Sequence, residues 1–74
     1  MYVSNDKRMG LWSEMKIHLE RHRKYVKEGR TESAILSEYY YCMGMVEAAR
    51  KLDIMDEKLL RDYESKLYAP YRKV

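Results

Sequence analysis

The sequence predicts an all-α protein of three helices, arranged as an antiparallel helical hairpin with a shorter third helix. Two observations lead to this prediction. Apolar residues recur at spacings of three and four, which is the helical period, and residues that favour helix ends stand where these patterns begin and stop. The expected helices cover about residues 11–28, 31–52 and 56–68. A chain of 74 residues is long enough for one domain.

The stretch from Thr31 to Leu52 is the element around which the others are expected to pack. One line along this predicted helix holds Ile35, Tyr39, Cys42, Val46 and Ala49, and a second line beside it holds Ala34, Tyr41, Met45, Ala48 and Leu52. A helix that is apolar nearly all round needs neighbours on several sides. We therefore expect a central, mostly buried helix.

The first predicted helix carries a single apolar face. Its spacing of 3, 4, 3 and 4 residues joins Trp12, Met15, Leu19, His22 and Val26. Gly29 is a suitable stop, because glycine tolerates the left-handed conformation that ends many helices. The connection to Thr31 is then very short, which favours an antiparallel hairpin. Residues 1–9 lack helical periodicity and are expected to form a flexible arm.

The third predicted helix is shorter and amphipathic. Either Asp53 or Asp56 can cap its start, and Ile54 or Met55 can pack onto its first turn. Its apolar side consists of Leu59, Leu60, Tyr63 and Leu67. Residues 69–74 follow as a basic, aromatic tail, in which the proline disfavours further helix.

The charges are unevenly distributed along the chain. The formal net charge is +3, but residues 16–30 carry +4, residues 31–57 carry −4 and residues 58–74 carry +3. One interpretation is that the basic first helix and the acidic second helix attract each other within the fold. A recognition helix for sequence-specific DNA is not expected, because the helix after the turn is acidic and apolar.

The leading candidate for a binding site is a basic and aromatic patch on the first helix. Its residues are Arg21, Arg23, Lys24, Tyr25, Lys27 and Arg30. Basic side chains neutralise phosphates, and a tyrosine ring can stack on a base. The function expected from the patch is non-catalytic capture of an anionic ligand, such as a nucleotide or a similar phosphate compound. The competing interpretation is a solvated helix face, because Glu20 and Glu28 dilute the charge.

No enzymatic site, cofactor or metal centre is expected. His18 and His22 are four residues apart, a spacing that can place two imidazoles on one metal, but the zincin pattern needs a glutamate directly after the first histidine. Cys42 lies on the buried line of the middle helix, where desolvation raises the pKa of a thiol and makes it inert.

Self-association is the second expectation. A chain of this size buries a modest core, and small scaffolds gain stability from disulfides, metals or oligomerisation. The single cysteine excludes an intrachain disulfide. The expected contact between copies in a homo-oligomer is the second apolar line of the middle helix, namely Tyr41, Met45, Ala48 and Leu52. The alternative function uses the same tyrosine- and methionine-rich surface to bind a host protein, as an inhibitor or adaptor.

The chain has neither a secretory leader nor an apolar run long enough to cross a bilayer, so a cytoplasmic protein without membrane contact is expected. Its layout is a stretch from Glu38 through Gly44 to Glu47, then the turn Leu52–Glu57, then a closing Leu67-Tyr68. This layout resembles that of many small helical proteins encoded by phages and mobile elements. The resemblance implies an inhibitor of host defence that sequesters a nucleotide signal or blocks a protein.

Overall fold

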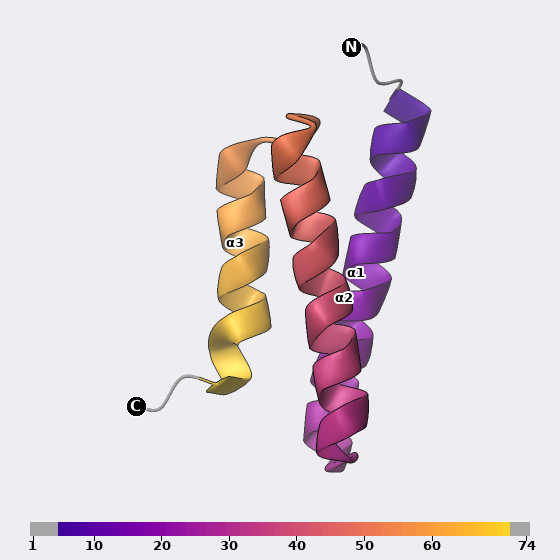
Figure 1. The fold of residues 1–74 in the computed structure, drawn as a ribbon, viewed down its shortest axis with the longest axis vertical. Coiled ribbons are helices and arrows are strands. Elements are labelled where there is room, and N and C mark those ends of the chain that lie inside the picture. The colour runs from indigo at the N-terminus through magenta and orange to yellow at the C-terminus, as the bar shows by residue number, and fades with distance from the viewer. Residues whose placement is uncertain (1–4, 72–74) are drawn as a thin grey trace.

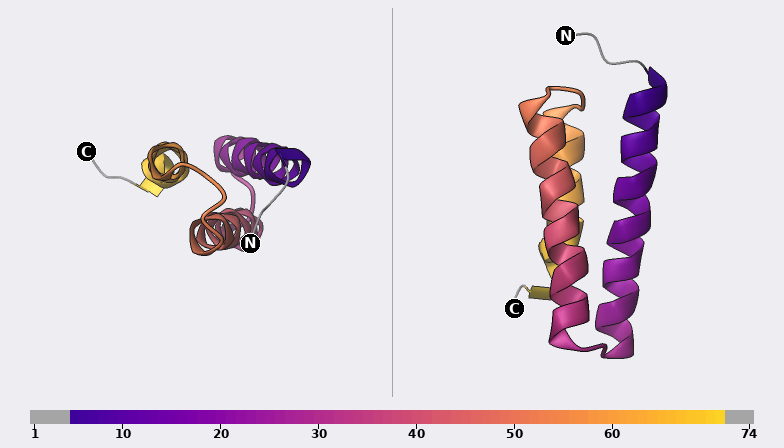
Figure 2. Two further views of the ribbon diagram at one scale, coloured as in Figure 1. Left: turned by 90° about the horizontal axis from the view of Figure 1, so that it is seen from above. Right: turned by 45° about the vertical axis from the view of Figure 1, so that its right-hand side comes forward.

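The structure is a computed structural model that describes residues 5–71, and it confirms an all-α protein of three helices. These are α1 (Asn5–Glu28), α2 (Glu32–Lys51) and α3 (Glu57–Tyr68), followed by the short 3-10 helix η1 (Ala69–Tyr71). The hairpin of α1 and α2 is antiparallel, and α3 runs back alongside α2 (Figure 1). Seen from above, the three helices form a small triangular bundle (Figure 2).

The first helix begins about six residues earlier than predicted. Residues 5–9 are helical, so the expectation of a flexible arm is wrong for them. The arm was predicted from missing apolar periodicity, but helix also propagates through good helix formers such as Lys7, Arg8 and Met9 once a neighbouring turn has formed. The rest of the predicted arm (1–4) and the end of the predicted tail (72–74) lie outside the described residues.

The predicted helix boundaries in the middle of the chain are confirmed. The Thr31 side chain accepts a hydrogen bond from the backbone N–H of Ala34 at 3.2 Å, which caps the start of α2. Gly29 has a φ of +67° and ends α1 in the left-handed conformation. Of the two candidate caps for α3, Asp56 is used, and its carboxylate accepts from the N–H of Lys58 at 2.8 Å.

The core lies where the three helices meet. Its buried apolar residues are Met15, Leu19, Cys42, Val46, Ala49, Ile54, Met55, Leu60, Tyr63 and Leu67. The Tyr63 hydroxyl donates a buried hydrogen bond of 2.6 Å to the carbonyl of Met15, which joins α3 to α1. At the surface, Arg50 of α2 forms ion pairs with Glu57 at 3.0 Å and Glu64 at 2.6 Å on α3. The third helix is therefore attached to both members of the hairpin.

The second helix is central, as predicted, but it is not buried nearly all round within one chain. The line through Cys42 and Val46 is buried, whereas Tyr41 and Leu52 expose 53% and 61% of their surface. At about 100° per residue, Tyr41 and Leu52 lie on one flank of α2. Arg50, which contacts α3, lies on the opposite flank. One chain thus covers this apolar surface of α2 only in part: α1 contacts Tyr41 through His18, but Tyr41 and Leu52 stay largely exposed.

Candidate functional site

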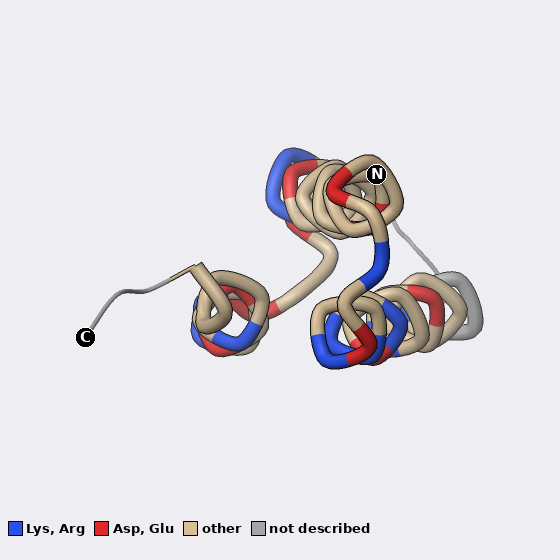
Figure 3. The backbone as a smooth tube through the Cα atoms, turned by 90° about the horizontal axis from the view of Figure 1, so that it is seen from below, with Lys and Arg blue, Asp and Glu red and all other residues tan. Residues whose placement is uncertain are grey.

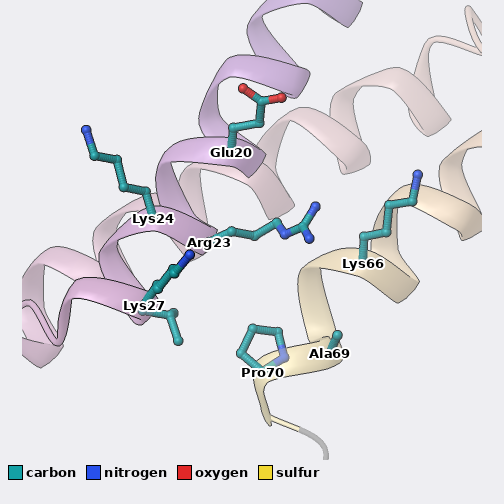
Figure 4. Close-up of a pocket in the computed structure, with 8 residues that line it drawn as sticks. Glu20, Arg23, Lys24, Lys27, Lys66, Ala69 and Pro70 are labelled. Atoms are coloured by element: carbon teal, nitrogen blue, oxygen red, sulfur yellow. The ribbon is translucent and has the colours of Figure 1, made fainter.

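A groove lies between the second half of α1 and the end of α3. It has a volume of about 880 Å³. Its lining residues are Glu20, Arg23, Lys24, Val26, Lys27, Lys66, Ala69 and Pro70, most of which are labelled in Figure 4. We call it the α1–α3 groove. It combines an apolar floor with a cationic rim, because Val26, Ala69 and Pro70 lie among four basic side chains.

The basic side chains approach the groove from two helices. Arg23 extends from α1 toward α3, where Lys66 stands on the facing side (Figure 4). Within residues 5–71, neither Arg23 nor Lys24 nor Lys27 forms an ion pair, and Lys66 pairs with the exposed Asp62 on its own helix at 3.2 Å. Basic side chains from two helices therefore line one groove, and the Glu20 carboxylate lines the same groove from α1. Figure 3, seen from below, shows Lys and Arg on both α1 and α3, with Asp and Glu interspersed among them.

Part of this basic character has a purely structural explanation. The carbonyl end of a helix carries partial negative charge, and basic side chains in the last turn offset it. Lys27 is in the last turn of α1 and Lys66 is in the last turn of α3. Arg23 lies more than one turn before the end of α1, where that effect has faded. The helix-end effect therefore does not account for Arg23.

The structure divides the six predicted ligand-binding residues between two surfaces. Arg23, Lys24 and Lys27 line the α1–α3 groove. The other three predicted residues are Arg21, Tyr25 and Arg30, and they line a second depression of about 500 Å³. Ile17, Glu20 and Lys24 complete the lining of this depression. Lys24 therefore stands on the ridge between the two surfaces.

The second depression is close to electrically neutral. Arg21 is bound to Glu38 at 3.4 Å, and Arg30 is bound to Glu28 at 3.1 Å. The Arg30 guanidinium also lies 4.9 Å from the centroid of the Tyr25 ring, so this ring already has a cationic partner on one side. The charges that are free to meet an anion are consequently concentrated in the α1–α3 groove.

His22 is a buried polar residue beneath the turn that forms one wall of the groove. Its side chain is inaccessible to solvent, and its Nε2 lies 2.8 Å from the hydroxyl of Tyr71. Its Nδ1 is buried without a hydrogen-bond partner in the described residues. Burial lowers the pKa of His22 below its ordinary value of 6.5, and the nearby Glu38 carboxylate opposes this effect only in part.

This lowered pKa predicts that acid destabilises the fold. The unfolded chain takes up a proton on His22 near pH 6.5, whereas the folded chain resists it, so the stabilisation is complete above pH 6.5 and declines as the pH falls below that value. Urea unfolding at about pH 7.5 and about pH 5 measures the loss. The variant His22→Phe has no group to titrate there and should lose less stability than the wild type. Equal losses in both proteins would contradict this assignment.

The two histidines do not act as a pair. The His18 imidazole contacts the Glu38 carboxylate at 2.6 Å and stacks on the Tyr41 ring with centroids 4.1 Å apart, while His22 contacts Tyr71. Over the described ranges, no cluster of three histidine, cysteine or acidic side chains is arranged to hold a metal ion. Cys42 is fully buried, and burial raises the pKa of its thiol, as the sequence predicted.

Sequence reasoning missed the groove residues that α3 and η1 supply. Lys66, Ala69 and Pro70 are about 40 residues from Arg23 in the chain, and only packing of α3 against α1 brings them together. The excess of basic residues after residue 58 was a signal, but it did not indicate which helix face these residues would join.

Comparison of the chain with protein-family models, with curated proteins and with solved structures finds no match in any of the three. Among the helices that the structure describes, none combines the length and the apolar character needed to cross a membrane.

Proposed function

We propose that this is a non-catalytic binding protein that captures a phosphate-bearing small molecule, such as a nucleotide, in the α1–α3 groove. The observation that carries the proposal is that two helices supply basic side chains to one groove, with Arg23 on α1 and Lys66 on α3. A bound anion would neutralise both charges and would link α1 to α3. A protein of this kind acts as a sponge or inhibitor by holding its ligand.

The shape and lining of the groove support a nucleotide rather than a bare anion. The volume of about 880 Å³ is in the range of small-molecule sites. Phosphates would meet Arg23, Lys27 and Lys66, while an apolar ring would pack on Val26 and Pro70. Glu20 at the rim repels phosphate and can accept hydrogen bonds from sugar hydroxyls or from a base.

Isothermal titration calorimetry with ADP, pyrophosphate and adenosine tests the proposal. ADP and pyrophosphate should bind, and their affinities should fall several-fold when the NaCl concentration rises from about 50 mM to about 300 mM, because salt screens these contacts. Adenosine, which lacks phosphate, should bind far more weakly than ADP. Absence of binding by both phosphate compounds at low salt would overturn the proposal.

A second candidate function is assembly through the exposed flank of α2. Tyr41, Met45, Ala48 and Leu52 lie on this flank; Met45 is half-buried and the other three are exposed. In an antiparallel pairing of two α2 helices centred between Gly44 and Met45, Tyr41 of one copy would face Ala48 of the other. Open space surrounds Gly44, so another backbone can approach closely there. We infer that the occupant of this flank is a second copy of the chain.

Native mass spectrometry and light scattering across a range of concentrations test the assembly. The wild type should form a closed oligomer, and Ala48→Glu should convert it to single copies without loss of helix. Tyr40→Glu is the matched control, because Tyr40 is 65% exposed but lies on the polar side of α2. A wild type that stays a well-folded single copy at high concentration would exclude self-association and would leave the flank as a surface for a different protein.

A further inference from the structure

The turn that follows α3 is attached to the hairpin by one aromatic side chain. The Tyr71 ring lies 5.1 Å from the Tyr39 ring of α2 in an edge-on arrangement and 5.6 Å from the His22 ring of α1, measured between centroids. The hydroxyl of Tyr71 also meets His22 Nε2 at 2.8 Å. One residue near the end of the described chain thus contacts both members of the hairpin.

The same turn forms one wall of the α1–α3 groove. Ala69 and Pro70 line the groove, and they directly precede Tyr71 in η1. Ala69 and Pro70 therefore face the groove, while the next residue, Tyr71, packs against His22 and Tyr39. A displacement of the Tyr71 backbone would also displace Pro70, which directly precedes it in η1.

The contact is strong enough to hold the turn and weak enough to open. Tyr71 keeps 45% of its surface exposed, so its ring can detach with His22 as the main buried side chain that becomes uncovered. A single hydrogen bond and two ring contacts hold it in place, and each of these is a modest interaction. The populations of the docked and undocked turn can therefore change when a ligand occupies the adjacent groove.

We propose that Tyr71 is a positioning residue of the α1–α3 groove: its docking between His22 and Tyr39 holds the Ala69–Pro70 wall in place, and undocking opens the groove and releases the ligand. This inference rests on the proposed function. Tyr71 does not line the groove, so it acts on the ligand only through the wall that it holds. By linkage, the factor by which docking of Tyr71 strengthens ligand binding equals the factor by which a bound ligand favours the docked turn.

Acid is expected to favour the undocked turn. A protonated His22 would present an N–H at Nδ1, for which the described residues supply no acceptor. The titratable and charged groups around it are Tyr71 of η1, Tyr39 and Glu38 of α2, and, on α1 itself, His18, Arg21 and Arg23. Only Glu38 favours the protonated ring, and it is already bound to His18.

The experiment compares wild type, Tyr71→Phe and Tyr71→Ala, with Tyr40→Ala as the control. Tyr40 also packs on the Tyr39 ring, with centroids 5.4 Å apart, and it lies near enough to Tyr71 to act on it electrostatically, but it does not line the groove. ADP affinity should fall about 5- to 20-fold in Tyr71→Ala and about 2- to 5-fold in Tyr71→Phe, which keeps the ring but loses the hydrogen bond. It should stay within about 2-fold of wild type in Tyr40→Ala.

A second measurement reports on the docking contact without ligand. The NMR titration of the His22 ring protons should move toward the ordinary histidine pKa in Tyr71→Ala, because water reaches the imidazole once the tyrosine is gone. Failure of the wild type to bind any phosphate compound would overturn the proposed function and the positioning role together. Binding of ADP by Tyr71→Ala with wild-type affinity would overturn the positioning role alone.

Discussion

Simultaneous replacement of Arg23 and Lys66 by alanine is expected to reduce the affinity for ADP or pyrophosphate at least about 50-fold. Charge-assisted hydrogen bonds contribute about 1.5–3 kcal/mol each, and each 1.4 kcal/mol corresponds to a factor of ten in affinity. Loss of two such contacts therefore removes most of the binding. Calorimetric titration at low salt measures the change.

The same double variant should keep the stability of the wild type within about 0.5 kcal/mol when no ligand is present. Removal of Lys66 loses its exposed pair with Asp62, while removal of both charges relieves repulsion between basic groups that line one groove. Both effects are small because the side chains reach solvent. Weaker binding together with undiminished stability would exclude unfolding as the cause of the lost affinity.

The matched control removes two positive charges elsewhere. Lys51 and Arg61 are exposed and do not line the α1–α3 groove, so Lys51→Ala combined with Arg61→Ala changes the net charge equally. This control should retain affinity within a few-fold of the wild type, since only long-range attraction is lost. An equal loss of affinity in both double variants would mean that binding depends on the net charge of the protein and not on the residues of the groove.

Leu60→Ala is expected to have the largest effect on stability. Leu60 is inaccessible to solvent at the centre of the core, and large-to-small substitutions at such sites cost about 2–5 kcal/mol. A domain of this size is stabilised by only about 5–10 kcal/mol in total. The melting temperature should therefore fall by about 10 °C or more. Circular dichroism during thermal unfolding measures the shift.

The neighbouring leucine is the control for this prediction. Leu59 is 38% exposed, so Leu59→Ala removes the same atoms from a partly solvated position and should cost less than about 1 kcal/mol. Both substitutions leave helix propensity similarly changed, because the two residues are adjacent in the first turns of α3. Equal destabilisation by the two variants would show that the core is not centred on Leu60.

Local chemistry explains why the helices and their ends could be predicted from the residues. Thr31, Asp56 and Gly29 act within three residues of their own positions, through a capping oxygen or a left-handed φ. The three-four spacing of apolar residues likewise depends only on the helical period. Met15, Leu60 and Leu67 are buried as their positions in the pattern predicted.

The start of α1 and the exposure of α2 show where that reasoning stops. Residues 5–9 are helical without an apolar pattern, because propensity continues a helix that packing has already formed. Tyr41 and Leu52 belong to an apolar line, but their exposure depends on which flank of α2 the short third helix covers. The apolar spacing shows on which face of its own helix a side chain lies. It does not show whether another helix packs against that face.

Sequence alone was enough for three helices, their caps and most of the core, because each depends on interactions between residues a few positions apart. The groove required the folded chain: Lys66 and Pro70 join Arg23 across about 40 residues, and Tyr71 reaches His22 across 49. Such contacts depend on the relative placement of α1 and α3, and this placement results from the packing of the whole core. The architecture was therefore predictable from local rules, while the candidate binding site was not.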